Sequence, residues 1–250
     1  MDGIYLIKCG KLFDGIDESL KDDYQVLIED ARIVDVGRDI PFPEYASIID
    51  LSDYIVTPGL IDAHVHPEFF DWKPLYNDYH TYSDEWFALA TIHTAKKTLQ
   101  GGFTTIRAMG SLARGYGLAD AKMAIEAGYF EGSRLVIAPH SMSATGGHGD
   151  LSQLLHRHSM VSDVVKSISV GSGADFFREM VRRDIKYGAD FIKIIVSGGF
   201  STINDLPDEQ QLTDDELQAI FEIANIKGMP VTAHAYTHDI IEKLVGFGIK

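Results

Sequence analysis

Two histidines one residue apart, His64 and His66, end an apolar stretch that begins at the turn signal Pro58-Gly59. Side chains alternate between the faces of a strand, so both imidazoles are expected on the same side. Neutral imidazole is the commonest metal ligand among side chains, and two on one face can share a cation. The pair therefore predicts a metal site, with a polar strand end as the alternative.

A lysine and a histidine interrupt two apolar segments farther along the chain. Lys193 lies in Asp190-Phe-Ile-Lys-Ile-Ile-Val-Ser-Gly-Gly199, where desolvation penalises an ammonium group. It is either a lysine whose charged head reaches water at a strand end, or an amine carboxylated by CO₂, whose two oxygens can bridge two cations. His234, at the end of another apolar segment, is either a hydrogen-bonded core residue or a ligand placed like His66.

Tyrosine and a glycine-rich loop add candidates for contacts with substrate. Tyr236 shares a strand face with His234 by alternation, and it either donates a hydrogen bond to a polarised carbonyl or packs at the strand end. The three glycines of Ser143-Ala-Thr-Gly-Gly-His-Gly-Asp150 permit close approach of the backbone to a ligand, which His148 and Asp150 could contact. The alternative for this segment is a flexible surface loop.

Other signals are weaker. Ser197-Gly-Gly-Phe-Ser201 either frames a pocket or forms a turn, and His140 follows an apolar segment. The remaining histidines have no supporting pattern and are expected to be solvated or to cap helices: His80, His93, His156, His158 and His238.

Composition limits the classes of function. The chain has 250 residues, 45% hydrophobic and 24% charged, and a formal net charge of -15, which argues against nucleic acid or an anionic membrane as the main partner. Cys9 is the only cysteine, so an intrachain disulfide is excluded and a reducing compartment is favoured. The chain shows neither a signal-peptide pattern nor an apolar run of the ~20 residues that a membrane span needs, so we expect a cytoplasmic protein.

The elements that position these residues change in character near residue 57. Before it, short β-rich runs separated by turn signals predict a small β module with strands at Ile4–Ile7, Gln25–Glu29, Arg32–Val36 and Ser47–Asp50. After it, five β-rich runs are predicted at Leu60–Val65, Phe103–Arg107, Leu135–Ala138, Phe191–Val196 and Val231–Ala235. Helices are predicted between and after them, at Asp84–Gln100, Leu118–Ala127, Ala174–Tyr187, Asp214–Lys227 and His238–Phe247.

Repeated strand–helix units with buried strands predict an α/β fold with a parallel sheet, either doubly wound or a (β/α)₈ TIM-type barrel. No G-x-G-x-x-G follows a strand, which weakens the doubly wound, dinucleotide-binding version. The sequence holds five units where a barrel needs eight. We therefore expect either a C-terminally incomplete barrel or a sheet that does not close.

Taken together, these features resemble the amidohydrolase superfamily. The resemblance covers nearly the whole chain and is carried by the β module, Pro58-Gly-Leu-Ile-Asp-Ala-His-Val-His66, Gly102-Phe-Thr-Thr-Ile-Arg107, Lys193 and His234. The Thr-Gly-Gly-His-Gly-Asp150 loop narrows it to a branch similar to Xaa-Pro dipeptidases and imidazolonepropionases. It implies a small N-terminal β-sandwich module at 1–57 and a barrel at 58–250.

The resemblance also implies a site and a reaction. The resemblance implies two divalent metal ions, with zinc as the expected metal. His64 and His66 would hold one ion, carboxylated Lys193 would bridge to the second, and His234 would hold that second ion. A metal-bridging hydroxide would then attack an amide bond of a dipeptide or an N-acyl amino acid, with Tyr236 and His148 as catalytic residues. The partner is thus a small molecule or dipeptide, and a homo-oligomer is compatible with the sequence.

Departures from the family pattern keep alternatives open. Ala108 follows Arg107 where an aspartate is usual, and the family's sixth-strand histidine and eighth-strand aspartate are absent from this sequence. A cyclic amidohydrolase similar to imidazolonepropionase is one alternative. A non-catalytic, truncated metal-binding domain is the other.

Overall fold

A computed structural model of the chain describes residues 3–69, 82–111, 113–154, 166–200, 202 and 205–250. Contacts between residues divide the chain into two compact units, Met1–Gly59 and Leu60–Lys250. In the described residues, no helix is both long enough and apolar enough to cross a bilayer.

The first unit is a five-stranded sheet. Its strands are β1 (Ile4–Leu12), β2 (Lys21–Asp22), β3 (Gln25–Glu29), β4 (Arg32–Gly37) and β5 (Ser47–Val56). They follow the order β2-β1-β3-β4, with β5 parallel to β1 and the other pairs antiparallel. Four of the five strands were predicted, and the two-residue β2 was not. The predicted β module is thus present as a sheet, and its sandwich form stays a prediction.

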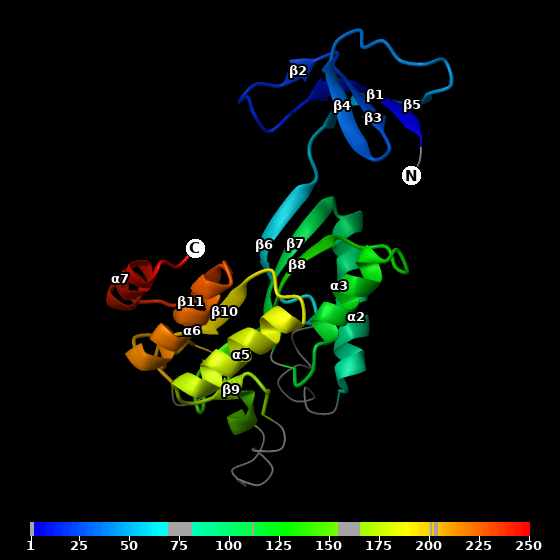
Figure 1. The fold of residues 1–250 in the computed structure, drawn as a ribbon. Coiled ribbons are helices and arrows are strands. Elements are labelled where there is room, and N and C mark those ends of the chain that lie inside the picture. Colours follow the sequence, from blue (N-terminus) through cyan, green and yellow to red (C-terminus); the bar gives the residue numbers. More distant parts are fainter. Residues whose placement is uncertain (1–2, 70–81, 112, 155–165, 201, 203–204) are drawn as a thin grey trace. The chain divides into compact units, whose positions relative to one another are not determined.

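The second unit contains the predicted parallel sheet. Its strands are β6 (Leu60–Val65), β7 (Phe103–Ser111), β8 (Arg134–Ala144), β10 (Ile192–Ile195) and β11 (Val231–His234), with the short β9 (Val170–Gly171) beside β8. The spatial order β11-β10-β8-β7-β6 repeats the chain order without reversal. A doubly wound sheet would reverse direction at a switch point, so this arrangement is the curled sheet of a half-barrel (Figure 1).

Helices connect the strands and cover one face of the sheet (Figure 1). They are α2 (Asp84–Gln100), α3 (Gly117–Glu126), α5 (Ala174–Lys186), α6 (Asp214–Ile226) and α7 (His238–Phe247), with a 3₁₀ turn at Leu151–Leu154. The predicted bounds of α2 and α7 are confirmed, and those of the other three helices are correct to within one residue at each end. Strong start signals explain this accuracy, because Ser83 caps α2 and Thr213 with Glu216 forms a capping box on α6.

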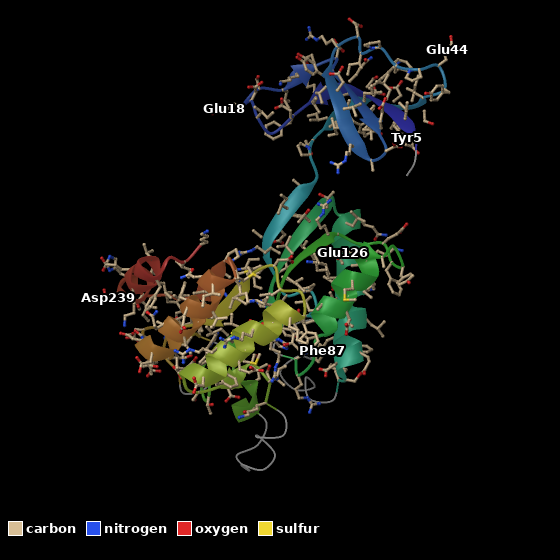
Figure 2. The ribbon with its side chains drawn as sticks, viewed as in Figure 1. Tyr5, Glu18, Glu44, Phe87, Glu126 and Asp239 are labelled. Atoms are coloured by element: carbon tan, nitrogen blue, oxygen red, sulfur yellow. The ribbon has the colours of Figure 1, made fainter. Side chains whose placement is uncertain are left out.

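The core of the second unit lies between the sheet and these helices. Ile192 and Ile194 of β10 are fully buried and belong to the same apolar cluster as Phe177 of α5 and Leu217 of α6. Phe87 of α2 is likewise in the interior, whereas Asp239 of α7 reaches solvent (Figure 2). Because all these strands are parallel, their carboxyl ends meet at one edge of the sheet, and that edge carries the polar candidates of the sequence.

Glu216 should be a stabilising residue beyond its own helix. Its buried carboxylate accepts hydrogen bonds from the amides of Thr213 at 2.8 Å and of Gly173, which precedes α5, at 2.7 Å. Glu216→Ala should therefore lower the free energy of unfolding by about 2 kcal/mol, because two backbone amides lose their charged acceptor. Urea unfolding measures this, and exposed Asp215→Ala, expected to cost less than about 0.5 kcal/mol, is the control. Equal losses in both variants would contradict the bridging role.

Candidate active site

Strand pairing brings Lys193 and His234 to the same face of the sheet. His234 on β11 is the register partner of Ile195 on β10, and residues directly opposite each other point the same way. Ile195 lies two residues after Lys193, so both share a face by alternation. The electrostatic influence of Lys193 on the pKa values of His64, His66 and His234 places the four predicted ligands near one another.

Lys193 is a buried lysine without a counter-ion among the described residues. Only 4% of it is exposed. Burial and, to a smaller extent, the guanidinium of Arg107 lower the pKa of Lys193 to about 8, and no hydrogen bond offsets these effects. Arg107 itself lies over the ring of Phe191, with its guanidinium carbon 4.0 Å from the ring centre. Of the two interpretations of Lys193, the lysine that reaches water is therefore wrong.

Burial favours the neutral form of His64, in β6, and of His66, which follows β6, and a hydrogen bond fixes the tautomer of the neutral His66. Burial lowers the pKa of His66 to about 4, and partial burial lowers that of His64. The Nδ1 atom of His66 lies 3.0 Å from the carbonyl oxygen of Gly110. A carbonyl can only accept, so Nδ1 carries the hydrogen and Nε2 keeps its lone pair. The two rings lie edge to face, with their centroids 5.7 Å apart.

His234 has the opposite tautomer. Its Nε2 atom lies 3.2 Å from the carbonyl oxygen of Gly198, so Nε2 carries the hydrogen and Nδ1 keeps the lone pair. Burial lowers the pKa of His234, and the positive charges of His148 and Lys193 would lower it further. A backbone carbonyl thus orients the rings of both His66 and His234. Metal-ligating histidines are commonly oriented by an outer-shell hydrogen-bond acceptor of this kind.

The donor set fits a divalent metal pair only if Lys193 is modified. In the part of the chain that the structure describes, no group of three or more His, Cys, Asp or Glu residues could hold a metal ion. The predicted set contains three histidines and a lysine, and an ammonium offers no lone pair. A carboxylated Lys193 would supply the missing anionic oxygens, and among the described residues no hydrogen bond engages its amine.

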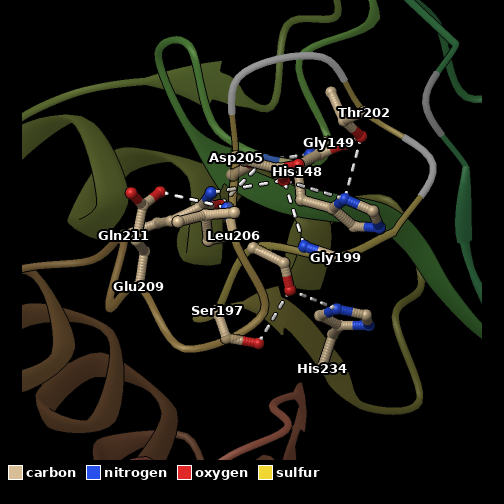
Figure 3. A network of polar contacts seen from close by, with 12 residues as sticks. His148, Gly149, Ser197, Gly199, Thr202, Asp205, Leu206, Glu209, Gln211 and His234 are labelled. Carbon is tan, nitrogen blue, oxygen red and sulfur yellow. Dashed lines mark hydrogen bonds and ion pairs between the residues drawn. The ribbon is translucent and has the colours of Figure 1, made fainter.

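The glycine-rich loop after β8 makes internal polar contacts, and its last two residues, Gly149 and Asp150, are buried rather than on the surface. The carboxylate of Asp150 accepts hydrogen bonds from the Gly146 amide at 2.9 Å and from Ser152. Both oxygens of Asp150 are therefore engaged inside the loop. His148 instead faces the site, where its ring stacks on that of His234 with centroids 4.8 Å apart and an interplanar angle of 18° (Figure 3).

Tyr236 lies at the rim of the same cluster. Half of its surface is exposed. Its ring makes T-shaped contacts with the ring of His234, at 4.9 Å between centroids, and with the ring of Phe200, at 5.2 Å. The segment after β10 that holds Phe200 is closed by a bridge between Ser197 and Gln210.

Several polar residues at this edge escaped the sequence analysis. Asp205, Thr202 and Gln211 all bond to His148, but they lie 54 or more residues beyond it, and no spacing rule connects them. Glu68 is fully buried, and burial raises its pKa to about 7. Its position two residues after His66 was the available signal, because a carboxylate next to a buried strand end is costly unless it has a partner.

The other histidines divide into two groups. His140 is fully buried, with Nδ1 2.9 Å from Asp184 and Nε2 3.0 Å from the Gly115 carbonyl, so both of its nitrogens are used inside the fold. His93 belongs to α2, and His238, whose side chain is exposed, begins α7. His80, His156 and His158 lie outside the described residues.

Replacing Lys193 should stabilise the metal-free protein. At pH 7, Lys193→Met should raise the free energy of unfolding on the order of 2 kcal/mol, because it removes a buried charge and keeps the volume. The advantage should shrink between pH 8 and 10.5, where the unfolded lysine still binds a proton that the folded one has lost, so wild-type stability rises with pH. Denaturant unfolding in the presence of a chelator measures this difference in stability, and Lys227→Met, at an exposed lysine, is the control. A Lys193→Met protein that is less stable than wild type at pH 7 would contradict the prediction.

Comparison with known proteins identifies the family of the chain. The model described as "Amidohydrolase family" matches residues 55–250. Ochratoxinase of Aspergillus niger is 29% identical over 249 residues, which cover 93% of this chain and 50% of that protein. Among solved structures, a Xaa-Pro dipeptidase with bound methionine in the active site is 27% identical, with a TM-score of 0.84. A prolidase complexed with N-methylphosphonate-L-proline is 30% identical, with a TM-score of 0.83.

These matches differ in how much of each protein they include. The chain is covered almost completely, to 99% in both structures, but it spans only 60% of each of those chains and half of the ochratoxinase. The family match itself extends over the whole second unit and the last five residues of the first. The chain belongs to the amidohydrolase family.

Proposed function

We propose that this chain forms the substrate and metal face of a binuclear metal-dependent hydrolase that cleaves the amide bond of dipeptides or N-acyl amino acids. The observation that carries the proposal is the environment of Lys193. Its amine is buried, has no hydrogen-bond partner among the described residues and feels the positive charge of Arg107. Such an arrangement is unfavourable for an ammonium and favourable for an anion in the same place.

Carboxylation of Lys193 would replace its electrostatic repulsion from Arg107 with attraction. The neutral amine of Lys193 adds to CO₂, a nitrogen–carbon bond forms, and the proton that the nitrogen loses passes to water. The product is a carbamate with one negative charge. The guanidinium of Arg107, which lowers the pKa of the free amine, would then stabilise the carbamate. Burial that excludes competing water favours the same product.

The residues that would hold two divalent ions follow from their free lone pairs. His64 and His66, the latter through Nε2, would bind one ion, the two oxygens of carboxylated Lys193 would bridge, and His234 would bind the second through Nδ1. When bound, the ions supply an activated water and polarise the scissile carbonyl. Zinc is the ion we propose, because imidazole and carboxylate ligands both suit it.

Substrate would lie against His148, Tyr236 and Phe200. His148 and Tyr236 both contact the ring of His234, so their polar ends lie next to the proposed second ion. The exposed ring of Phe200 beside Tyr236 offers an apolar surface for a side chain. Names of the relatives support an amide on an amino-acid nitrogen, since they include a Xaa-Pro dipeptidase and a prolidase bound to a proline whose nitrogen carries a phosphonate.

Lys193→Met should abolish both metal binding and hydrolysis. Purified protein should contain two divalent ions per chain by elemental analysis, and the variant should contain at most one, because the bridging anion is lost. Hydrolysis of N-acyl amino acids should fall by at least about 1,000-fold, whereas Lys227→Met should retain both properties. A Lys193→Met protein with two ions and full activity would sink the proposal.

The choice of substrates separates the alternatives in the same experiment. Dipeptides with and without proline, N-acyl amino acids and a cyclic amide are compared at equal concentration. We expect cleavage of the first two classes. Cleavage confined to the cyclic amide would replace the proposed reaction with that of a cyclic amidohydrolase, and no cleavage by a metal-loaded full-length protein would favour a metal-binding domain without catalysis.

A further inference from the structure

His148 is held by two partners at a single ring nitrogen. Its Nδ1 atom lies 3.0 Å from Oδ2 of Asp205 and 2.8 Å from Oγ1 of Thr202 (Figure 3). The Asp205 side chain is 1% exposed and that of His148 is 16% exposed, so water cannot readily substitute for these contacts. Neither partner was assigned a role by the sequence or by the proposed ligand set.

The surrounding bonds determine which atom donates. Asp205 Oδ2 also receives the Gly199 amide at 3.1 Å and the Gln211 side-chain amide at 3.4 Å, so that oxygen acts as an acceptor. Thr202 Oγ1 lies 3.1 Å from the carbonyl oxygen of His148, which can only accept, so the single hydroxyl hydrogen is committed there. Both atoms that face Nδ1 are therefore acceptors, and Nδ1 carries the hydrogen.

The ring is also fixed in position. A Cβ atom on Gly199 would lie 2.1 Å from Cε1 of His148, so the imidazole packs directly on the glycine backbone. It stacks on His234, and its own amide donates to the Gln211 side chain at 2.8 Å. Among the described residues, no hydrogen bond reaches Nε2 of His148. That atom is the part of the ring left for a ligand.

We propose that Asp205 and Thr202 are positioning residues, which hold His148 as the Nδ1–H tautomer and so reserve its Nε2 atom for the substrate. The use of Nε2 rests on the proposed function, whereas the tautomer follows from the hydrogen bonds alone. In the neutral ring Nε2 accepts a hydrogen bond, for example from an N–H group of the substrate. An amide nitrogen next to the scissile bond offers such a group.

The hydrogen bonds of Asp205 predict how an asparagine would be oriented in its place. Two backbone or side-chain N–H groups besides His148 point at Oδ2, so an asparagine must place its oxygen there and its amino group at the Oδ1 position. Oδ1 of Asp205 is buried without a hydrogen-bond partner. Asp205→Asn should therefore keep the Nδ1–H tautomer, whereas Asp205→Leu, of similar size, removes the acceptor altogether.

Nitrogen-15 NMR of the histidine rings in the metal-free protein tests the tautomer. His148→Gln identifies the His148 signals. Wild type and Asp205→Asn should show the hydrogen on Nδ1, and Asp205→Leu should shift at least half of the ring population to Nε2–H. Thr202→Val should shift it in the same direction, and Thr202→Ser should restore it. A wild-type ring with its hydrogen on Nε2, or no change in both Asp205→Leu and Thr202→Val, would overturn the proposal.

Kinetics of the metal-loaded protein tests the consequence. Asp205→Leu should lower kcat/KM about 10- to 100-fold with metal content unchanged, and Asp205→Asn should recover most of it. If the tautomer shifts and kcat/KM does not, the positioning role is overturned while the hydrolase remains. If wild type cleaves none of the substrates, the proposed function fails, and the NMR result still decides how Asp205 and Thr202 act on the ring.

Discussion

Repulsion between two cations in a poorly hydrated space governs the edge of this sheet. Arg107 keeps its charge under all ordinary conditions, and its position over the Phe191 ring fixes it there. Lys193 has no such support, and burial between apolar strand residues adds to the cost of its ammonium. The pair therefore favours any state in which the lysine is no longer a cation. The neutral histidines nearby belong to the same pattern, since a protonated ring would add a third positive charge.

Backbone carbonyls at strand ends organise the imidazoles around this pair. The carbonyl of Gly110, near the end of β7, orients His66, and the carbonyl of Gly198, which follows β10, orients His234. Gly110 has a φ of +88°, and a Cβ there would lie 2.5 Å from the backbone of His140. Only glycine fits such a position, so the orientation of a candidate ligand depends on a residue without a side chain.

The sequence was most informative where the signal is local. Helix bounds followed from caps such as Thr213, and the shared face of Lys193 and His234 followed from strand period. The sequence said little where partners are distant. β7 and β8 continue beyond their predicted ends because they pair with each other and with β9, and Asp205 meets His148 only through the fold of two loops. Such contacts leave no period or motif in the chain.

The segment between β10 and α6 combines two tightly packed glycines, Gly198 and Gly199, with two exposed apolar side chains, Phe200 and Leu206. Its glycines cannot change, because a Cβ on Gly198 would lie 2.2 Å from the Leu206 carbonyl oxygen and one on Gly199 would enter the His148 ring. Phe200 and Leu206, in contrast, are 80% and 58% exposed. Phe200 and Leu206 can thus be replaced without a change in the packing of the two glycines. Substitutions there would change the apolar surface that the loop exposes, while the backbone contacts that hold the His148 ring stay the same.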